Sequence, residues 1–476
     1  MDTTKTELVV LGAGPGGYAA AFYAADKGKK VVMVEKDPRL GGVCLNRGCI
    51  PSKALLHAAK LISETRESDH RGISFGEPKI DLDKLRAWKN SILDKLGGGI
   101  AMLAKQRGVD VVHGRGYFED SNTLRIETED GQKFLQFETA IISVGSKSAM
   151  PKAFDLGNPR VMTSREALDV PDVPGNLLVV GGGYIGMELG TVYAALGSKV
   201  VVVEALGSIL TGADADLVRP VQRYAEKAFQ QVRVKTKVLS MATAGKQIKV
   251  VMEKDGQKLE EFYDRVLVSV GRVPNHADLG LENTKVTKDD RGFIKVSEKQ
   301  QTNDPAIYAI GDIAGGALLA HKAAREARVA VDAILGEYNA LTEYIIPAVV
   351  FTDPELAWCG LTETEAKEKG TTVKVARFPW SASGRALTFD RPDGLTKLIL
   401  DPQTERLLGA GIVGHGAGEL IGEAVLAIEM GATAFDLASS IHPHPTLSET
   451  LMECAEVFYG HATHTFTRKE PVRRET

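Results

Sequence analysis

A glycine-rich stretch that occurs twice constrains the fold of this chain most strongly. Residues 12–17 read GAGPGG and follow the apolar run ELVVL at residues 7–11, with a helix-forming stretch behind them. Residues 181–186 read GGGYIG and stand in the same setting. In each copy the next apolar run ends in a glutamate, Glu35 or Glu204. Each copy therefore predicts a strand, a tight turn, a helix and a second strand of a parallel sheet.

The glycine spacing in each copy is the one that a bound dinucleotide requires. Gly12 makes the tight turn, Gly14 lets the backbone approach a diphosphate, and Gly17 allows close helix–strand packing. The diphosphate rests on the helix N-terminus, and Glu35 accepts hydrogen bonds from the adenosine ribose. The same pattern returns 169 residues later in Gly181, Gly183 and Gly186. Because Glu204 accepts a 2′-hydroxyl and repels a 2′-phosphate, the second copy predicts NAD rather than NADP.

The two cysteines of GGVCLNRGCIPSK, residues 41–53, form the main chemical feature. In a regular helix Cys44 and Cys49 lie ~140° apart around the axis, with Cα atoms roughly 8–9 Å apart, too far for a disulfide. Pairing needs a distorted helix, which Gly48 permits and Pro51 supports by lacking an N–H. So small a loop gains little stability from a bridge. Reversible redox chemistry at a helix start is therefore the predicted role, with two reduced core cysteines or half of a metal site as the alternative.

Three other residues are weaker candidates when each is taken alone. Lys53 lies four residues after Cys49, on the same helical face, where its charge favours an anion; it also suits a solvent-facing lysine. Glu188 comes early in the second helix, as acids near a helix N-terminus often do. Asp312 follows a strand and a glycine, a position that suits either a turn or a cofactor contact.

Residues 442–449, HPHPTLSE, form the third chemical stretch. We expect Pro445 to be the first residue of a helix, with His444 at the cap. A histidine at a helix N-terminus holds a proton less tightly, and Glu449 about one turn further on opposes this effect and orients the ring. The arrangement predicts a general acid/base that works near neutral pH. A capping or metal-binding element is the alternative.

Length and composition indicate a globular protein of several domains. The 476 residues exceed what one core supports, and the net charge of −4 gives no reason to expect a nucleic acid or a membrane as partner. With four cysteines and no expected signal peptide or membrane span, we expect a cytoplasmic protein. Cys359 and Cys454 should be core residues. From about residue 347, alternating strands and turns predict an antiparallel sheet, and the polar residues 467–476 should be loose.

Together these stretches resemble the pyridine nucleotide–disulfide oxidoreductases over about residues 7–462, most closely the members that oxidise dihydrolipoamide. The resemblance implies an α/β chain with two Rossmann-like dinucleotide-binding domains, one for FAD and one for NAD, a central domain and a C-terminal α+β dimerisation domain. The domains expected in chain order are FAD-binding at 1–150, NAD-binding at 151–279, central and completing the FAD site at 280–346, and interface at 347–476.

The resemblance also implies a role for each matching residue. Cys44 resembles the thiol that exchanges with substrate, and Cys49 the thiol that faces the flavin and forms the charge-transfer thiolate. His444 resembles an acid/base contributed by the partner subunit of a homodimer, with Glu449 as its orienting group. Lys53 and Glu188 resemble an ion pair near the flavin. Further residues match FAD contacts (Glu35, Gly116, Asp312 and Ala320) or NAD contacts (Glu204, Val238 and Gly271).

The activity implied is oxidation of a protein-bound dihydrolipoyl group to its disulfide with reduction of NAD. We expect the lipoyl carrier to come from another protein, a 2-oxo acid dehydrogenase complex or the glycine cleavage system. A related reductase of glutathione or mercuric ion is the alternative, which Glu204 and the lack of a C-terminal cysteine pair disfavour. Outside enzymes, the alternative is a flavin-bearing structural subunit without turnover. No metal is expected.

Overall fold

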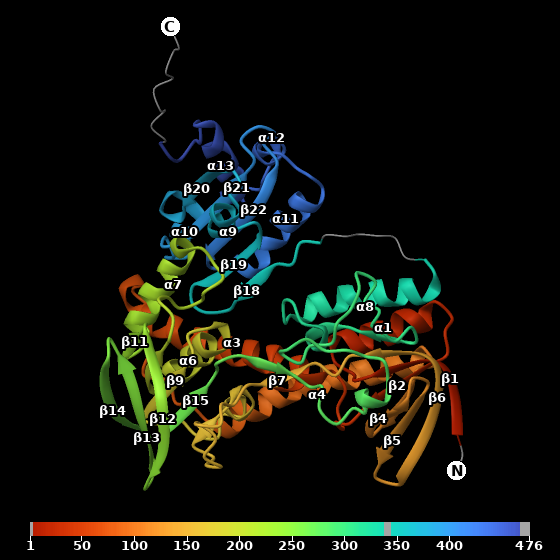
Figure 1. The fold of residues 1–476 in the computed structure, drawn as a ribbon. Helices are drawn as coiled ribbons and strands as arrows, with labels where there is room; N and C mark the ends of the chain where they lie inside the picture. Colours follow the sequence, from red (N-terminus) through yellow and green to blue (C-terminus); the bar gives the residue numbers. More distant parts are fainter. Residues whose placement is uncertain (1–2, 338–343, 467–476) are drawn as a thin grey trace.

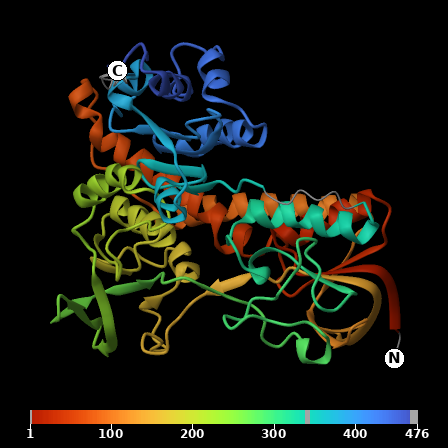
Figure 2. The ribbon, with the colours of Figure 1, turned by 45° about the horizontal axis from the view of Figure 1, so that its top comes forward.

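The computed structural model describes residues 3–337 and 344–466, arranged as a first unit with a mixed sheet, a second unit with a parallel sheet and a C-terminal unit with an antiparallel sheet (Figure 1). Both views place the C-terminal unit, in blue, above the other two (Figures 1 and 2). Residues 467–476, expected to be loose, lie outside the described residues. No helix in the described ranges is both long and apolar enough to cross a membrane.

The first unit is built on a seven-stranded sheet of order β3-β2-β1-β6-β5-β4, with β17 paired to β6. Its strands are β1 (Thr3–Leu11), β2 (Val31–Glu35), β3 (Asp110–His113), β4 (Arg115–Asp120), β5 (Thr123–Thr128), β6 (Gly131–Ile142) and β17 (Ile307–Ala309). Its helices are α1 (Pro15–Asp26), α2 (Gly42–Arg47), α3 (Cys49–Glu67), α4 (Leu82–Gln106) and α8 (Ala320–Leu335), with short 3₁₀ turns η1 (Asp69–Arg71), η2 (Leu281–Asn283) and η3 (Gly311–Ala314). Since β2 is buried along its whole length, the apolar run before Glu35 belongs to an interior strand.

The second unit repeats this plan in an all-parallel five-stranded sheet of order β11-β10-β9-β15-β8. Its strands are β8 (Val161–Met162), β9 (Asn176–Val180), β10 (Lys199–Val203), β11 (Gln231–Arg233) and β15 (Arg265–Val268), and its helices are α5 (Ser164–Leu168), α6 (Tyr184–Leu196) and α7 (Ala215–Ala228). An antiparallel sheet of β12 (Thr236–Ala244), β13 (Gln247–Lys254) and β14 (Gln257–Tyr263) covers it, and β7 (Ser146–Ser148) pairs with β16 (Arg272–Pro274).

The C-terminal unit contains the antiparallel sheet that the alternating pattern predicts, in the order β18-β19-β22-β21-β20. Its elements are β18 (Ala348–Val350), β19 (Glu355–Gly360), α9 (Glu363–Lys369), β20 (Lys374–Pro379), η4 (Trp380–Ala382), α10 (Gly384–Thr388), β21 (Leu395–Leu400), β22 (Leu407–Gly414), α11 (Ala417–Glu429), α12 (Ala434–Ser439) and α13 (Glu449–Tyr459). Cys359 and Cys454 are core residues as predicted, with 2% and 0% exposed. The predicted fold class is thus confirmed, while the domain boundaries at 150, 279 and 346 stay predictions.

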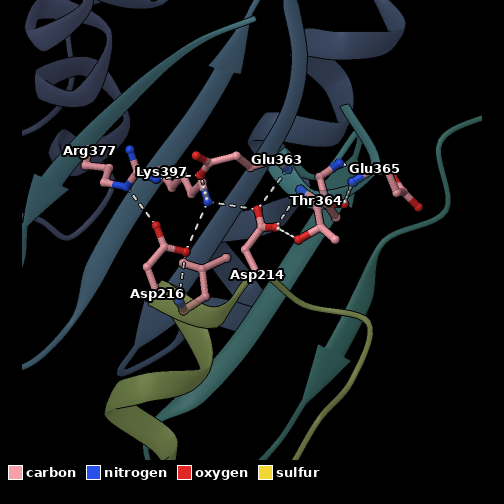
Figure 3. A network of polar contacts seen from close by, with 9 residues as sticks. Asp214, Asp216, Glu363, Thr364, Glu365, Arg377 and Lys397 are labelled. Atoms are coloured by element: carbon pink, nitrogen blue, oxygen red, sulfur yellow. Dashed lines mark hydrogen bonds and ion pairs between the residues drawn. The ribbon is translucent and has the colours of Figure 1, made fainter. Parts of the chain in front are cut away.

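A buried lysine joins the second unit to the C-terminal unit (Figure 3). Lys397 on β21 is 1% exposed, and its Nζ lies 2.8 Å from Asp214, 3.0 Å from Asp216 and 2.7 Å from Glu363. Asp214, just before α7, also accepts the backbone N–H groups of Glu363 and Thr364 at 3.0 Å each. One carboxylate of the second unit therefore caps α9 of the C-terminal unit.

Candidate active site

A cavity of about 470 Å³ lies between the first and second units and collects most of the predicted site residues. Ten of them line it: Gly12, Gly14, Glu35, Cys44, Cys49, Lys53, Gly116, Glu188, Asp312 and Ala320. The structure thus brings the cysteine pair, the first glycine turn and the acidic and basic candidates to one place.

The two cysteines are close in space because the helix breaks between them, as predicted. Helix α2 ends at Arg47 and α3 begins at Cys49, with Gly48 at φ −149° and ψ −111°. A Cβ on Gly48 would lie 3.0 Å from the carbonyl oxygen of Val43, so the chain passes itself closely at the break. Both cysteines are free thiols here, and the Cys44 thiol is hydrogen-bonded to Cys49.

This contact makes the two thiols electrostatically unequal. Donation from Cys44 lowers the pKa of Cys49 to about 7 against the opposing effect of burial, and the charge of Lys53 lowers it further. The same hydrogen bond and burial raise the pKa of Cys44. Cys49 is also the first residue of α3, where a helix favours an anion. Burial by contrast raises the pKa of both Cys359 and Cys454 to about 12, so reactivity is confined to the cavity.

Lys53 and Glu188 form the ion pair that the family resemblance implies. Lys53 Nζ lies 2.8 Å and 3.0 Å from the two carboxylate oxygens of Glu188, which is 3% exposed. Glu188 also accepts the Ser52 hydroxyl at 2.8 Å and the backbone N–H of Phe351 at 3.0 Å. The Lys53 ammonium lies 4.4 Å from the centre of the Phe351 ring. Contacts from three units therefore hold this pair beside the thiols.

The first glycine turn has the geometry that a dinucleotide needs. Gly12 has φ +101°, and a Cβ on Gly17 would lie 1.8 Å from the Gly12 carbonyl oxygen, so both positions require glycine. No side chain caps α1 at Gly14, which leaves its first N–H groups available to a diphosphate at the cavity wall. Glu35 accepts the backbone N–H of Ala13 at 2.8 Å. The first turn therefore fits the diphosphate of a dinucleotide.

Asp312 is held at the cavity by side chains for which the sequence analysis predicted no role. It accepts a hydrogen bond from Ser146, and Arg272 donates to the Ser146 hydroxyl at 2.7 Å. Glu326 accepts the N–H of Gly311 at 2.7 Å and pairs with Lys322 at 2.7 Å, both residues being buried in α8. Helix α8 thus positions the Gly-Asp turn that follows β17.

The second glycine turn repeats the first outside this cavity. Gly181 has φ +105°, a Cβ on Gly186 would lie 2.1 Å from the Gly181 carbonyl oxygen, and Gly183 precedes the first residue of α6 without a side-chain cap. Glu204 accepts the N–H of Gly182 at 2.7 Å, just as Glu35 accepts that of Ala13. The turn therefore fits a second dinucleotide at the open end of α6.

The two other residues matched to NAD contacts differ in exposure. Gly271 follows β15 with φ +123° and open space around it. Val238 lies in β12 with its side chain packed in the core, 8% exposed. Any contact of Val238 with a ligand is therefore made by its backbone, next to the irregularity that interrupts β12 after this residue.

The predicted helix start at Pro445 is wrong. Helix α13 begins at Glu449, and Pro445 lies in the turn before it, after a cis peptide bond. The Thr446 hydroxyl donates to the Pro443 carbonyl at 2.8 Å, and the Thr446 N–H donates to Glu449 at 2.7 Å. These local bonds replace a first helical turn. His444 is therefore not a helix cap, and the argument from the helix end does not apply to it.

His444 and Glu449 lie in contact, as the predicted pairing requires. His444 Nδ1 lies 2.9 Å from a carboxylate oxygen of Glu449. Burial opposes ionisation of Glu449, but the hydrogen bonds from Thr446 and His444 hold its pKa below the usual value. The pair is not among the residues that line the thiol cavity, and α13 lies at the far end of the C-terminal unit (Figure 1). No cluster suited to a metal ion occurs among the residues described.

Sequence reasoning missed the side chains that complete the cavity. Arg272, Ser146 and Tyr184 all line it. The only feature of the sequence that could have indicated Arg272 is its position after a buried strand. Neither Ser146 nor Tyr184 belongs to a residue pattern that predicts a role in the site. Their roles come from contacts between segments more than one hundred residues apart, as in the Arg272–Ser146 bond with a separation of 126.

Comparison with known proteins agrees with this geometry. Residues 6–327 match the family described as pyridine nucleotide-disulphide oxidoreductase, and residues 346–455 match its dimerisation domain. A dihydrolipoyl dehydrogenase of Vibrio cholerae is 47% identical over 96% of this chain and 97% of its own length. The Haemophilus influenzae enzyme of that name is 48% identical over 96% of each chain.

Solved structures show the same arrangement. LpdA from Mycobacterium tuberculosis superposes with a TM-score of 0.88 at 27% identity, over 95% of this chain and 99% of that one. The flavoprotein disulfide reductase RclA from Escherichia coli gives 0.84 at 27% identity, over 95% and 99%. With two family models that together span most of its length, the chain belongs to the pyridine nucleotide-disulphide oxidoreductase family.

Proposed function

We propose that this protein catalyses the oxidation of dihydrolipoyl groups to the cyclic disulfide with reduction of NAD⁺. The observation that carries the proposal is the pair Cys44 and Cys49, brought together at a helix break with the pKa of one thiol lowered to about 7. Full-length relatives at 47% and 48% identity carry the name dihydrolipoyl dehydrogenase. The chain is accordingly a flavoprotein oxidoreductase.

FAD in the first unit and NAD in the second are the proposed cofactors. Two glycine turns with open helix ends, α1 and α6, support one dinucleotide each. When bound, FAD supplies the two-electron chemistry that connects a dithiol to NAD. Gly14, Gly116, Asp312 and Ala320 line the cavity as its contacts, and Glu35 orders the first turn. Glu204, Gly271 and the backbone of Val238 serve NAD.

The thiol steps are assigned to this chain's own residues. With the pair oxidised, a substrate thiolate attacks the sulfur of Cys44, the Cys44–Cys49 bond breaks, and Cys49 leaves as the thiolate. The second substrate thiolate then attacks its own partner sulfur and releases Cys44. The substrate is oxidised by two electrons, and the cysteine pair is reduced by two. Lys53, held by Glu188, stabilises the Cys49 thiolate.

His444 accepts the protons of the substrate thiols and Glu449 orients its ring. Because this pair is remote from the cavity of its own chain, we place it in the site of the partner subunit of a homodimer. The C-terminal unit matches a dimerisation domain and exposes large apolar side chains. These include Leu426, Met430, Phe435 and Ile441. Burial of such a surface between two copies is favourable.

The protein that carries the lipoyl group is proposed to be a lipoyl domain of a 2-oxo acid dehydrogenase complex or of the glycine cleavage system. The cytoplasm is the proposed compartment, because its reducing conditions suit a thiol pair that cycles between two states.

A steady-state assay on the purified yellow protein tests the activity. We expect rapid NADH formation from dihydrolipoamide and NAD⁺, much slower reaction with NADP⁺, and no oxidation of NADH or NADPH by glutathione disulfide. Glutathione reduction faster than lipoamide turnover would assign the protein to another branch of the family.

A further inference from the structure

Helix α13 carries two histidine–carboxylate pairs rather than one. His444 contacts Glu449 at the start of the helix, as described above. One turn later, Glu453 is bonded to Nδ1 of His464, which lies in the segment after the helix. The backbone N–H of His464 also donates to Glu453 at 3.3 Å. The mechanism proposed above leaves this second pair without a role.

The positions of the two carboxylates make the second pair relevant to the first. Glu449 and Glu453 are four residues apart in α13, so their side chains share one face of the helix. The side chain of Glu453 is 6% exposed and that of His464 is 55% exposed. A buried carboxylate so close to Glu449 adds negative charge beside His444 unless a cation neutralises it.

We propose that His464 is a positioning residue for the acid/base pair. Paired with Glu453, His464 neutralises the second carboxylate of α13. Glu449 is then the only uncompensated negative charge of this pair of glutamates that acts on His444. This inference rests on the proposed function, in which His444 takes the substrate protons. The pKa of His464 is raised by its hydrogen bond to Glu453 and the charge of that group, and then by Glu449 and Glu456. These causes favour the charged histidine.

Among the described residues, the other charged groups on the elements packed against α13 form no ion pair with its carboxylates. Lys374 on β20 donates to the Phe458 carbonyl, and Asp436 on α12 accepts from Thr433. The remaining two, Arg377 on β20 and Lys397 on β21, are bonded to Asp216. The charges nearest His464 are therefore the three glutamates of α13 named above.

The test is the pH profile of NADH formation from dihydrolipoamide and NAD⁺ by the intact protein. In His464→Gln, Glu453 loses its cation, His444 retains its proton to higher pH, and the acid limb should move up by about half a pH unit. In the double variant Glu453→Gln/His464→Gln the extra charge is gone, so the limb should return to the wild-type position. His461→Gln is the matched control, since the His461 ring stacks on Tyr459 instead.

Two results would overturn this inference. One is a His464→Gln profile that superimposes on the wild-type profile; the other is a shift that persists in the double variant. Thermal melting of each variant separates a loss of folding from a change in ionisation. Absence of dihydrolipoamide turnover in the wild-type protein would instead refute the proposed function, so the two failures are distinguishable.

Discussion

At the scale of single residues, the environment decides which of four cysteines is reactive. Cys359 and Cys454 are buried in the core of the C-terminal unit, which raises the pKa of each thiol to about 12. Cys49 lies at a helix start, receives a hydrogen bond from Cys44 and has the Lys53 ammonium nearby, and its pKa falls to about 7. Only this thiol is substantially ionised at neutral pH.

This difference predicts the pH dependence of alkylation. In the reduced protein stripped of flavin, so that no bound ring covers Cys49, iodoacetamide should modify Cys49 first, with a rate that rises through an apparent midpoint near pH 7. Because the Lys53 charge favours the thiolate, Lys53→Met should move that midpoint to higher pH. Peptide mapping after alkylation at a series of pH values measures both effects. Preferential modification of Cys44, or an unmoved midpoint, would contradict the assignment.

At the scale of elements, both glycine turns were predictable because their requirements are local. The close approaches at Gly17 and Gly186 follow from a tight strand-to-helix turn that any such sequence must make. The start of α13 was not predictable in the same way. Hydrogen bonds of Thr446 to Pro443 and Glu449 stabilise a turn at Pro445. The sequence alone does not show that this turn is preferred over a helix beginning at Pro445.

The two turns predict separable losses of cofactor. Ala at position 186 places a Cβ 2.1 Å from the Gly181 carbonyl oxygen, so Gly186→Ala should raise the KM for NAD⁺ at least tenfold while the protein stays yellow. Gly17→Ala should instead yield protein with little flavin. The control is Gly76→Ala, where the added Cβ meets open space. Flavin absorbance and NAD⁺ kinetics measure the outcome, and loss of both cofactors in either variant would refute two independent sites.

At the scale of the whole molecule, contacts between distant segments hold the units together. Lys397 and Asp214 are 183 residues apart in the chain, and Lys53 and Glu188 are 135 apart. No local pattern marks either pair, so the sequence alone left Lys53 and Glu188 as ordinary surface residues. The resemblance to the family identified that pair, whereas the Lys397 cluster became evident only in the structure.

The Lys397 cluster predicts a large loss of stability. Lys397→Met leaves three carboxylates without their shared cation, which costs about 3–5 kcal/mol for a buried pair of this kind. We expect the first thermal transition to fall by several degrees, whereas the exposed control Lys369→Met should melt like the wild type. An unchanged melting profile in Lys397→Met would show that the cluster contributes nothing.

The same cluster predicts sensitivity to acid. Burial opposes ionisation of Asp214 and Asp216, but hydrogen bonds hold the pKa of both carboxyl groups below the usual value. The main donor to Asp214 is Lys397, and the main donors to Asp216 are Arg377 and then Lys397. A carboxylate whose pKa is lower in the folded than in the unfolded protein stabilises the fold at any pH above its unfolded-state pKa of about 4. This stabilisation is lost as the pH falls through the folded-state pKa. Thermal melting between pH 7 and pH 3 should therefore show a steeper decline for the wild type than for Lys397→Met.

A shared active site predicts complementation between two inactive variants. Cys44→Ser and His444→Gln homodimers should each have little dihydrolipoamide turnover. If His444 acts in the site of its partner, a heterodimer of the two variants contains one intact site and should recover about half of the wild-type activity. Co-expression with two affinity tags isolates that heterodimer. Its inactivity would place His444 in the site of its own chain.

The most direct test of the account compares the wild type with Cys44→Ser in NADH formation from dihydrolipoamide and NAD⁺. The account predicts that the variant retains its yellow flavin and its reaction with NADH but forms no NADH from dihydrolipoamide. Turnover of dihydrolipoamide by Cys44→Ser at the wild-type rate would contradict it, because electrons would then reach the flavin without passing through the cysteine pair.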